Sequence, residues 1–150
     1  WNKHIAAMKK GKKMERYKVI LVDDEAEVID MIEKKIHWND LGFEVAGSAT
    51  NGVKALELVE KLQPDVVLTD IKMPYMDGLE LSRRLNREYP NIYIMLCTGF
   101  DEFEYAKEAV HLEIKEYMLK PVNATELSES LTNLKHTLDR EREEKLNVKN

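Results

Sequence analysis

The chain has a single cysteine among its 150 residues, which excludes an internal disulfide. Cys97 lies in the apolar run IYIMLC, where we expect a buried structural thiol. No uncharged apolar run approaches the length of a membrane span, and the formal net charge of −5 gives no general excess of basic residues for coating nucleic acid. We therefore expect a cytoplasmic protein that contacts no membrane and binds no DNA by itself.

The N-terminus lacks the pattern of a signal peptide. In residues 1–13, WNKHIAAMKKGKK, the basic cluster follows the short apolar piece, and no apolar core comes after it. We interpret these residues as a disordered leader or a remnant of expression, with Met14 as a natural start. Residues 14–138 then form one domain, and residues 139–150 form a charged helical extension or a linker to an output domain that this chain does not contain.

Short β-rich runs alternate with stretches of helical period along the domain. The strand runs are continuously apolar, which is typical of strands buried on both faces of a parallel sheet. The pattern predicts an α/β protein with an open parallel sheet between two layers of helices. The predicted strands are 17–22, 43–49, 65–70, 92–98 and 116–120, and the predicted helices are 23–38, 51–62, 78–89, 101–112 and 123–140.

Apolar spacing predicts which face of two helices is buried. In the second helix the residues with helical spacing follow Asn51, which is placed to cap the helix. In the last helix a leucine recurs at intervals of four and three, which fits core packing or a coiled-coil extension. These residues are Val53, Leu56, Val59 and Leu62 in the second helix, and Leu127, Leu131, Leu134 and Leu138 in the last.

Charged and hydroxyl side chains stand where the predicted strands end. Asp23 and Asp24 follow the first strand, Asp70 ends the third, Thr98 ends the fourth and Lys120 ends the fifth. Alone, Asp70 could merely cap a turn. Parallel strands bring their carboxyl ends to one edge of the sheet, so these groups are expected to meet there. Three carboxylates in contact repel one another unless a cation lies among them, which predicts a Mg²⁺ site.

Four motifs in the order LVDDE, LTDIKMPYMDG, CTG and YMLKP resemble the signature of the response-regulator receiver domain of two-component signalling. The resemblance runs from about Tyr17 to Leu138. It implies a flavodoxin-like open sheet of five parallel strands in the order 2-1-3-4-5, with five helices on its two faces.

The resemblance also implies a role for each residue at the strand ends. Asp70 is the nucleophile that becomes phosphorylated, and it binds Mg²⁺ directly together with Asp24. Asp23 helps through water, and the backbone carbonyl of Lys72 completes the protein ligands. The remaining roles are charge neutralisation by Lys120, a hydrogen bond from Thr98 to the phosphoryl group, and a rotating aromatic switch at Tyr117.

The resemblance further implies partners and an output. A sensor histidine kinase supplies the phosphoryl group, and the chain catalyses only its own phosphorylation and dephosphorylation. The face made by residues 101–112, 116–120 and the helix from Asn123 is expected to switch and to form a homodimer when phosphorylated. The stretches IHWNDLGFEVAGSATNG and GFDEFEYAKEAV resemble regulators whose receiver precedes an AraC-type DNA-binding domain, which implies transcription regulation.

Two alternatives stay open. A stand-alone receiver would act by protein–protein contact. A Mg²⁺-dependent phosphohydrolase with an aspartyl-phosphate intermediate would need a second aspartate two residues after the first, where this chain has Lys72. Phe100, two residues after Thr98, is bulky and apolar, so we expect it to hinder water and to slow dephosphorylation.

Overall fold

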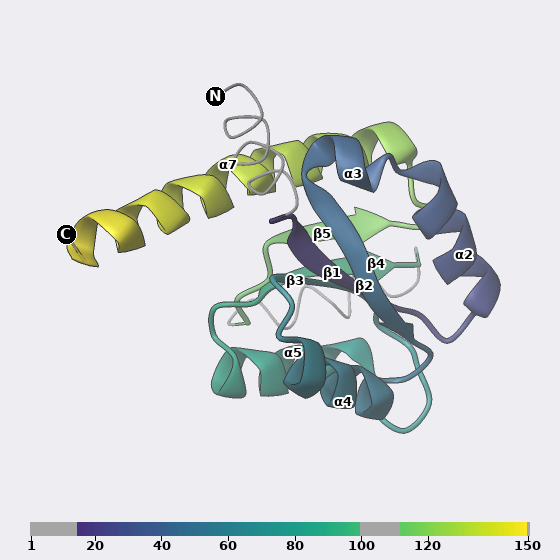
Figure 1. Ribbon diagram of the computed structural model, residues 1–150. Coiled ribbons are helices and arrows are strands. Elements are labelled where there is room, and N and C mark those ends of the chain that lie inside the picture. The colour runs from purple at the N-terminus through teal and green to yellow at the C-terminus, as the bar shows by residue number, and fades with distance from the viewer. Residues whose placement is uncertain (1–14, 100–111, 150) are drawn as a thin grey trace.

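A computed structural model describes residues 15–99 and 112–149 of the chain (Figure 1). Within them, five parallel strands form one sheet in the order β2-β1-β3-β4-β5, as predicted. The strands are β1 (Tyr17–Val22), β2 (Phe43–Ala49), β3 (Val66–Asp70), β4 (Tyr93–Thr98) and β5 (Glu116–Leu119).

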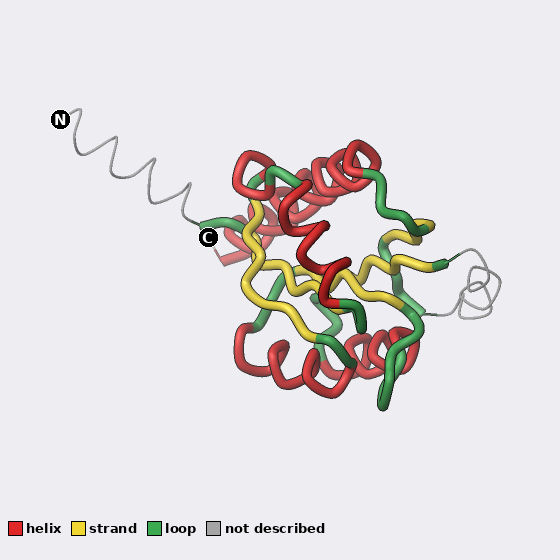
Figure 2. The backbone as a smooth tube through the Cα atoms, turned by 90° about the vertical axis from the view of Figure 1, so that its right-hand side faces the viewer, coloured by secondary structure: helices red, strands yellow, loops and turns green. Residues whose placement is uncertain are grey.

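Helices cover both faces of this sheet (Figures 1 and 2). One layer contains α2, α3 and α7, and the other contains α4 and α5. The helix predicted over residues 101–112 lies outside the described residues. None of the described helices combines the length and the apolar composition needed to cross a membrane. The bounds are α2 (Ala26–Lys35), α3 (Trp38–Leu41), α4 (Gly52–Leu62), α5 (Gly78–Glu88) and α7 (Ala124–Lys149).

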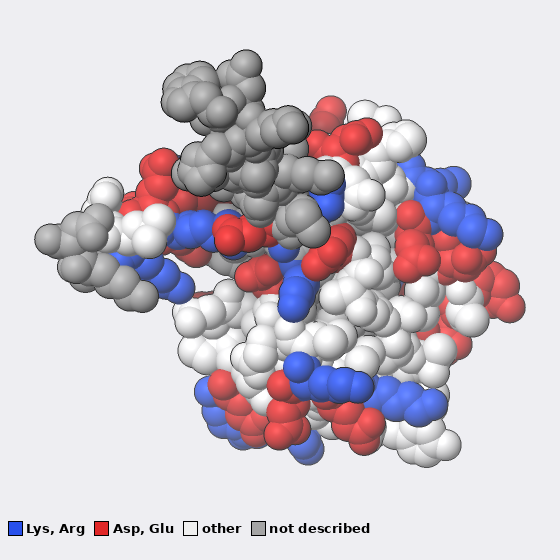
Figure 3. Space-filling model, in the orientation of Figure 1, with Lys and Arg blue, Asp and Glu red and all other residues white. Residues whose placement is uncertain are grey.

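The two helical layers explain why the strands are continuously apolar. In β1, Val19 and Leu21 join the core cluster under α2 and α7, whereas Ile20 and Val22 join the cluster under α4 and α5. Successive strand residues point to opposite faces, so a strand buried on both faces needs an apolar residue at every position. Charged side chains instead gather on the outer surfaces of α2, α4 and α7, as Figure 3 shows.

The first helical stretch differs from the prediction of one helix over residues 23–38. The chain forms α2, leaves helical geometry at Ile36 and then forms the short α3 from Trp38. Ile36 and Trp38 are both buried, but in a continuous helix residues two apart point about 200° away from each other. The break lets both side chains reach the core, and the Trp38 indole N–H donates to the Glu33 carbonyl at 3.1 Å.

The buried face of α4 also differs from the prediction. Val53, expected in the core, is 44% exposed, whereas Ala55 and Val59 are fully buried. The predicted cap is confirmed, because the Asn51 side-chain oxygen accepts a hydrogen bond from the Lys54 N–H at 2.9 Å. Gly52, the first residue of α4, is buried and lies against Met76. The backbone of Gly52 therefore faces the core at the start of α4, and the Val53 side chain does not.

Helix α7 is continuous from Ala124 to Lys149 and crosses the proposed boundary at residue 138, which stays a prediction. Its four periodic leucines lie in the core, so their spacing reflects core packing rather than a coiled coil. Beyond them the helix is held to the starts of two strands. The Tyr17 hydroxyl donates to Asp139 at 2.6 Å, and the Tyr93 hydroxyl donates to Glu141. The Arg142 guanidinium lies 4.6 Å from the centre of the Tyr17 ring.

Candidate functional site

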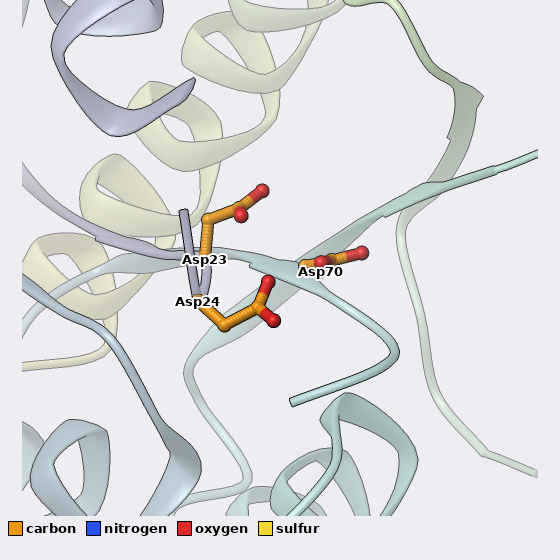
Figure 4. Close-up of side chains that lie close together, drawn as sticks. All are labelled: Asp23, Asp24 and Asp70. Atoms are coloured by element: carbon orange, nitrogen blue, oxygen red, sulfur yellow. The ribbon is translucent and has the colours of Figure 1, made fainter. Parts of the chain in front are cut away.

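The carboxyl ends of β1 and β3 bring three aspartates together (Figure 4). Asp23 and Asp24 follow β1, and Asp70 is the last residue of the neighbouring β3. Each offers a carboxylate oxygen, and these oxygens lie within 4.8 Å of one another. Asp23 and Asp70 are only 4% and 6% exposed, whereas Asp24 is exposed. Two buried carboxylates at this separation are unfavourable without positive charge nearby.

Backbone groups orient two of these carboxylates. The N–H of Glu25 donates to Asp23 Oδ1 at 2.9 Å, and the N–H of Ile71 donates to Asp70 Oδ1 at 2.8 Å. In each carboxylate the other oxygen, Oδ2, faces the side chain of Lys120. Each buried carboxylate is therefore held at one oxygen by the backbone of its own loop and contacts a cation with the other.

Lys120 supplies that positive charge. It follows β5, and its Nζ lies 2.8 Å from Asp23 Oδ2 and 3.1 Å from Asp70 Oδ2. Burial alone lowers the pKa of Lys120, but the hydrogen bond to Asp23 and the charges of Asp70 and Asp23 outweigh burial and raise it. The backbone N–H of Lys120 donates to the Thr98 carbonyl at 2.7 Å, which ties this lysine to the end of β4.

One lysine does not balance the carboxylates of the site. Burial raises the pKa of Asp70, and the charge of Asp23 raises it further, against the opposing effects of Lys120 and the Ile71 N–H. The resulting pKa of Asp70 is about 6. The carboxylate is thus ionised at neutral pH at an energetic cost, which a further cation at this site would reduce.

Thr98 is the last residue of β4 and is completely buried. Its hydroxyl has no hydrogen-bond partner within residues 15–99 and 112–149. A buried hydroxyl without a partner is rare in folded proteins, because the lost hydrogen bonds to water are not replaced. Its place between the ends of β3 and β5 suits a group that donates a hydrogen bond to a ligand at the site.

The other two predicted residues lie at the edge of the site. Lys72 is exposed, in the loop that joins β3 to α5. Tyr117 is in β5, partly buried, and packs against the small core cluster of Ile71, Leu79 and Leu96. Burial raises the pKa of its hydroxyl. Tyr117 therefore has one side on the core beside the site and one side toward solvent.

Two residues that support Asp70 were not predicted to do so. The Thr69 hydroxyl donates to the Asp70 carbonyl at 2.9 Å. Gly78 lies so close to the same carbonyl that a Cβ on it would be 2.0 Å from the oxygen, and its N–H donates to Ile71 O at 2.6 Å. Gly78 is the first residue of α5, and the need for a glycine there comes from the loop that folds back onto β3.

Comparison with known proteins gives a consistent family. A family described as "Response regulator receiver domain" matches residues 19–132. The chain is 42% identical over 125 residues, 83% of its length, to the uncharacterized transcriptional regulatory protein YesN of Bacillus subtilis. It is 34% identical over 122 residues, 81% of its length, to the transcriptional regulatory protein HptR of Staphylococcus aureus. These alignments cover 34% and 48% of the two relatives, so the chain spans less than half of their length.

Solved structures agree with this assignment. The REC domain of AraT, a response regulator from Geobacillus stearothermophilus, superimposes with a TM-score of 0.81 at 39% identity. That alignment covers 84% of this chain and 98% of the other. A two component transcriptional regulator AraC from Clostridium phytofermentans superimposes with a TM-score of 0.77 at 30% identity, over 84% of this chain and 98% of the other. The predicted resemblance to receivers of AraC-type regulators is confirmed, and the chain belongs to the response-regulator receiver domain family.

Proposed function

We propose that this receiver domain takes a phosphoryl group onto Asp70 from a phosphohistidine of a sensor kinase. The observation that carries the proposal is that Lys120 contacts both Asp70 and Asp23, with Asp24 beside them. In this proposal one of these carboxylates serves as the nucleophile, with the ammonium and the other acidic groups beside it at the sheet edge. Carboxylates act as nucleophiles in this way in aspartyl-phosphate chemistry.

The reaction exchanges one bond to phosphorus for another. A carboxylate oxygen of Asp70 attacks phosphorus, and the bond from phosphorus to the imidazole nitrogen of the donor breaks. The electron pair of that bond stays on the nitrogen, which takes up a proton from solvent. The product is a mixed anhydride on Asp70. Its later hydrolysis returns the carboxylate and releases inorganic phosphate, so the protein acts only on its own modification.

The residues present fit a Mg²⁺ ion. Mg²⁺ prefers oxygen ligands and is bound by one or two carboxylates together with waters and phosphate oxygens. Asp24 and Asp70 would hold the ion directly, Asp23 would assist through water, and the Lys72 carbonyl would complete the protein ligands. When bound, the ion supplies positive charge to the oxygens of the transferring group.

Lys120 and Thr98 complete the polar surroundings of the phosphoryl group. The Lys120 ammonium neutralises charge on the phosphoryl oxygens, which is the principal requirement in phosphoryl transfer. Thr98 then donates its hydroxyl hydrogen to a phosphoryl oxygen and gains the hydrogen bond that it lacks among the described residues. The movement of Thr98 gives Tyr117 room to turn inward, which changes the output face.

The output face is expected to include residues 101–112, β5 and the first half of α7. The proposal is that this face forms a homodimer when Asp70 is phosphorylated and controls a DNA-binding domain outside this chain, and hence transcription in the cytoplasm. The matches to two transcriptional regulatory proteins support this output.

The test is phosphorylation by a small donor. The protein is incubated with acetyl phosphate and Mg²⁺, and intact mass is measured for the unaltered chain, Asp70→Asn and Asp30→Asn. Asp30 is an exposed aspartate of α2, paired with Lys34, and serves as the control. We expect one added phosphoryl group on the unaltered chain and on Asp30→Asn, removable by hydroxylamine, and none on Asp70→Asn. Labelling of Asp70→Asn at the unaltered rate would refute the assignment.

A further inference from the structure

The loop that joins β3 to α5 presents an aromatic side chain to solvent. Tyr75 is 90% exposed and has a φ of +70°, in the left-handed region. We propose that Tyr75 is a recognition residue for the protein that donates the phosphoryl group, and that its ring packs on the donor's surface beside the phosphohistidine. This inference rests on the proposed function of Asp70.

The backbone around Tyr75 forms a tight turn. The N–H of Met76 donates to the Pro74 carbonyl at 2.8 Å, which closes a three-residue turn with Tyr75 at its centre. This hydrogen bond and the positive φ are those of the classic γ-turn, a rare and strained conformation. For a bulky residue such a φ is an outlier, whereas glycine or asparagine adopts it easily. Local backbone preference therefore does not account for a tyrosine at this position.

The loop is fixed on both sides of the turn. Met76 is buried and packs closely on Gly52, where a Cβ would meet Met76 atoms at 2.7–2.8 Å. Asp77 caps α5 by accepting from the Glu80 N–H at 2.8 Å, and Gly78 is bonded back to Ile71. Tyr75 is thus presented by a backbone that is anchored to α4, α5 and β3.

A fixed, exposed aromatic ring is suited to recognition. Tyrosine provides a large, partly apolar contact area with few rotatable bonds, and it is enriched among the residues that dominate interface energies. Because the loop is already ordered, a partner does not have to immobilise it on binding, which preserves affinity. The burial of neighbouring Met76 leaves the Tyr75 ring as the part of the turn that a partner meets.

The position of Tyr75 identifies the partner as the phosphodonor. Tyr75 follows Asp70 by five positions, so even a fully extended chain would place it within about 17 Å. A standard protein interface buries about 800 Å² on each partner, a disc with a radius of roughly 16 Å. An interface of this size around Asp70 therefore reaches about as far as Tyr75, so a protein that brings a phosphohistidine to Asp70 is the partner best placed to contact Tyr75. Acetyl phosphate is too small to reach both residues.

The experiment compares these two donors on the same variants. The source organism's sensor kinases are purified and autophosphorylated with radiolabelled ATP, and the one that transfers fastest to the unaltered chain is used. Transfer is measured for the unaltered chain, Tyr75→Asn, Tyr75→Phe and Leu146→Asn. Leu146 is another exposed apolar residue, 57% exposed and near the far end of α7, so its variant controls for a general loss of exposed apolar surface.

We expect Tyr75→Asn to lower kcat/KM for the kinase by about tenfold, the size typical of an interface anchor. Its rate at saturating receiver should be near the unaltered value, because the loss is in binding. Tyr75→Phe should keep kcat/KM within about twofold, since the ring remains. Leu146→Asn should match the unaltered chain, and all four proteins should react equally with acetyl phosphate.

Two results would overturn the inference. One is an unchanged kcat/KM for Tyr75→Asn with the kinase. The other is an equal loss with kinase and acetyl phosphate, which would place the effect on Asp70 chemistry rather than on recognition. If the unaltered chain reacts with neither donor, the proposed function of Asp70 fails instead, so the two failures are distinguishable.

Discussion

Replacing Asp70 by asparagine is expected to stabilise the metal-free protein. The pKa of Asp70 is about 6 in the folded chain, raised from the ordinary value of 3.8. This difference of roughly two pKa units corresponds to about 3 kcal/mol at pH 7.5, where the carboxylate is charged in both states. Asparagine has nearly the same shape and carries no charge, so Asp70→Asn should recover up to about 3 kcal/mol. For a chain of this length the melting temperature should rise by roughly 6–12 °C.

The pH dependence follows from the direction of the shift. Because the folded pKa is the higher one, the native state binds the proton more tightly than the unfolded state, and stability is lost as pH rises from about 4 through 6. The stability gained by Asp70→Asn should therefore shrink to about 1 kcal/mol at pH 4.5. Other groups titrate in both proteins and cancel in the comparison.

The assay is thermal or urea unfolding of both proteins in EDTA at pH 7.5 and 4.5, and again in Mg²⁺ at pH 7.5. Ligand that binds only the folded state stabilises it, so Mg²⁺ should raise the stability of the unaltered protein and narrow its difference from Asp70→Asn. A variant that is less stable than the unaltered protein in EDTA at pH 7.5 would show that burial and the charge of Asp23 do not make the Asp70 carboxylate unfavourable.

Four other variants test the surroundings of the site and the anchoring of α7. Gly78→Ala places a Cβ 2.0 Å from a carbonyl oxygen and should cost about 2 kcal/mol or more in urea unfolding, so an unchanged midpoint would contradict the close packing. Thr98→Val removes a buried hydroxyl that has no hydrogen-bond partner among the described residues. The free energy of unfolding in urea should therefore increase by about 1 kcal/mol, and a decrease would mean that the hydroxyl does have a hydrogen-bond partner. Combined Tyr17→Phe and Tyr93→Phe substitutions remove two hydrogen bonds to α7. Amide hydrogen exchange in the last turns of α7 should therefore become faster, and unchanged exchange would mean that other contacts hold these turns in place. Phe100, outside the described residues, is predicted to shield the phosphoryl group, so Phe100→Ala should shorten the phosphorylated lifetime measured by radiolabel loss, and an equal lifetime would exclude shielding.

Sheet architecture was predictable because the strands are built mainly from continuous apolar runs. Residues 19–22 and 94–97 are buried in succession, which requires helical layers on both faces of the sheet, and helices between the strands require the strands to be parallel. The place of the site was predictable for the same reason. Asp70 and Lys120 are far apart in sequence, but each stands at the carboxyl end of its strand, and parallel strands bring those ends to one edge.

The departures concern residues whose burial depends on contacts between elements. Helical spacing selected Val53 for the core of α4, but Gly52 lies against Met76 of a distant loop, and that contact rotates the helix. The break before Trp38 likewise arises because Ile36 and Trp38 are both buried, and one continuous helix could not point both side chains into the core. Neither contact is visible in local periodicity, because each involves a partner that only the folded chain supplies.

Each of two strands connects the site with the far part of α7. β1 leads to Asp23 at one end and carries Tyr17 at the other, and β4 runs from Tyr93 to Thr98. A hydrogen-bonded strand hardly stretches, so a displacement of β4 along its axis at Thr98 would reach its first residue, about 16–17 Å away. At that residue the Tyr93 hydroxyl donates a hydrogen bond to Glu141. A displacement of β4 at Thr98 would therefore reach the contact between Tyr93 and Glu141, in the C-terminal half of α7.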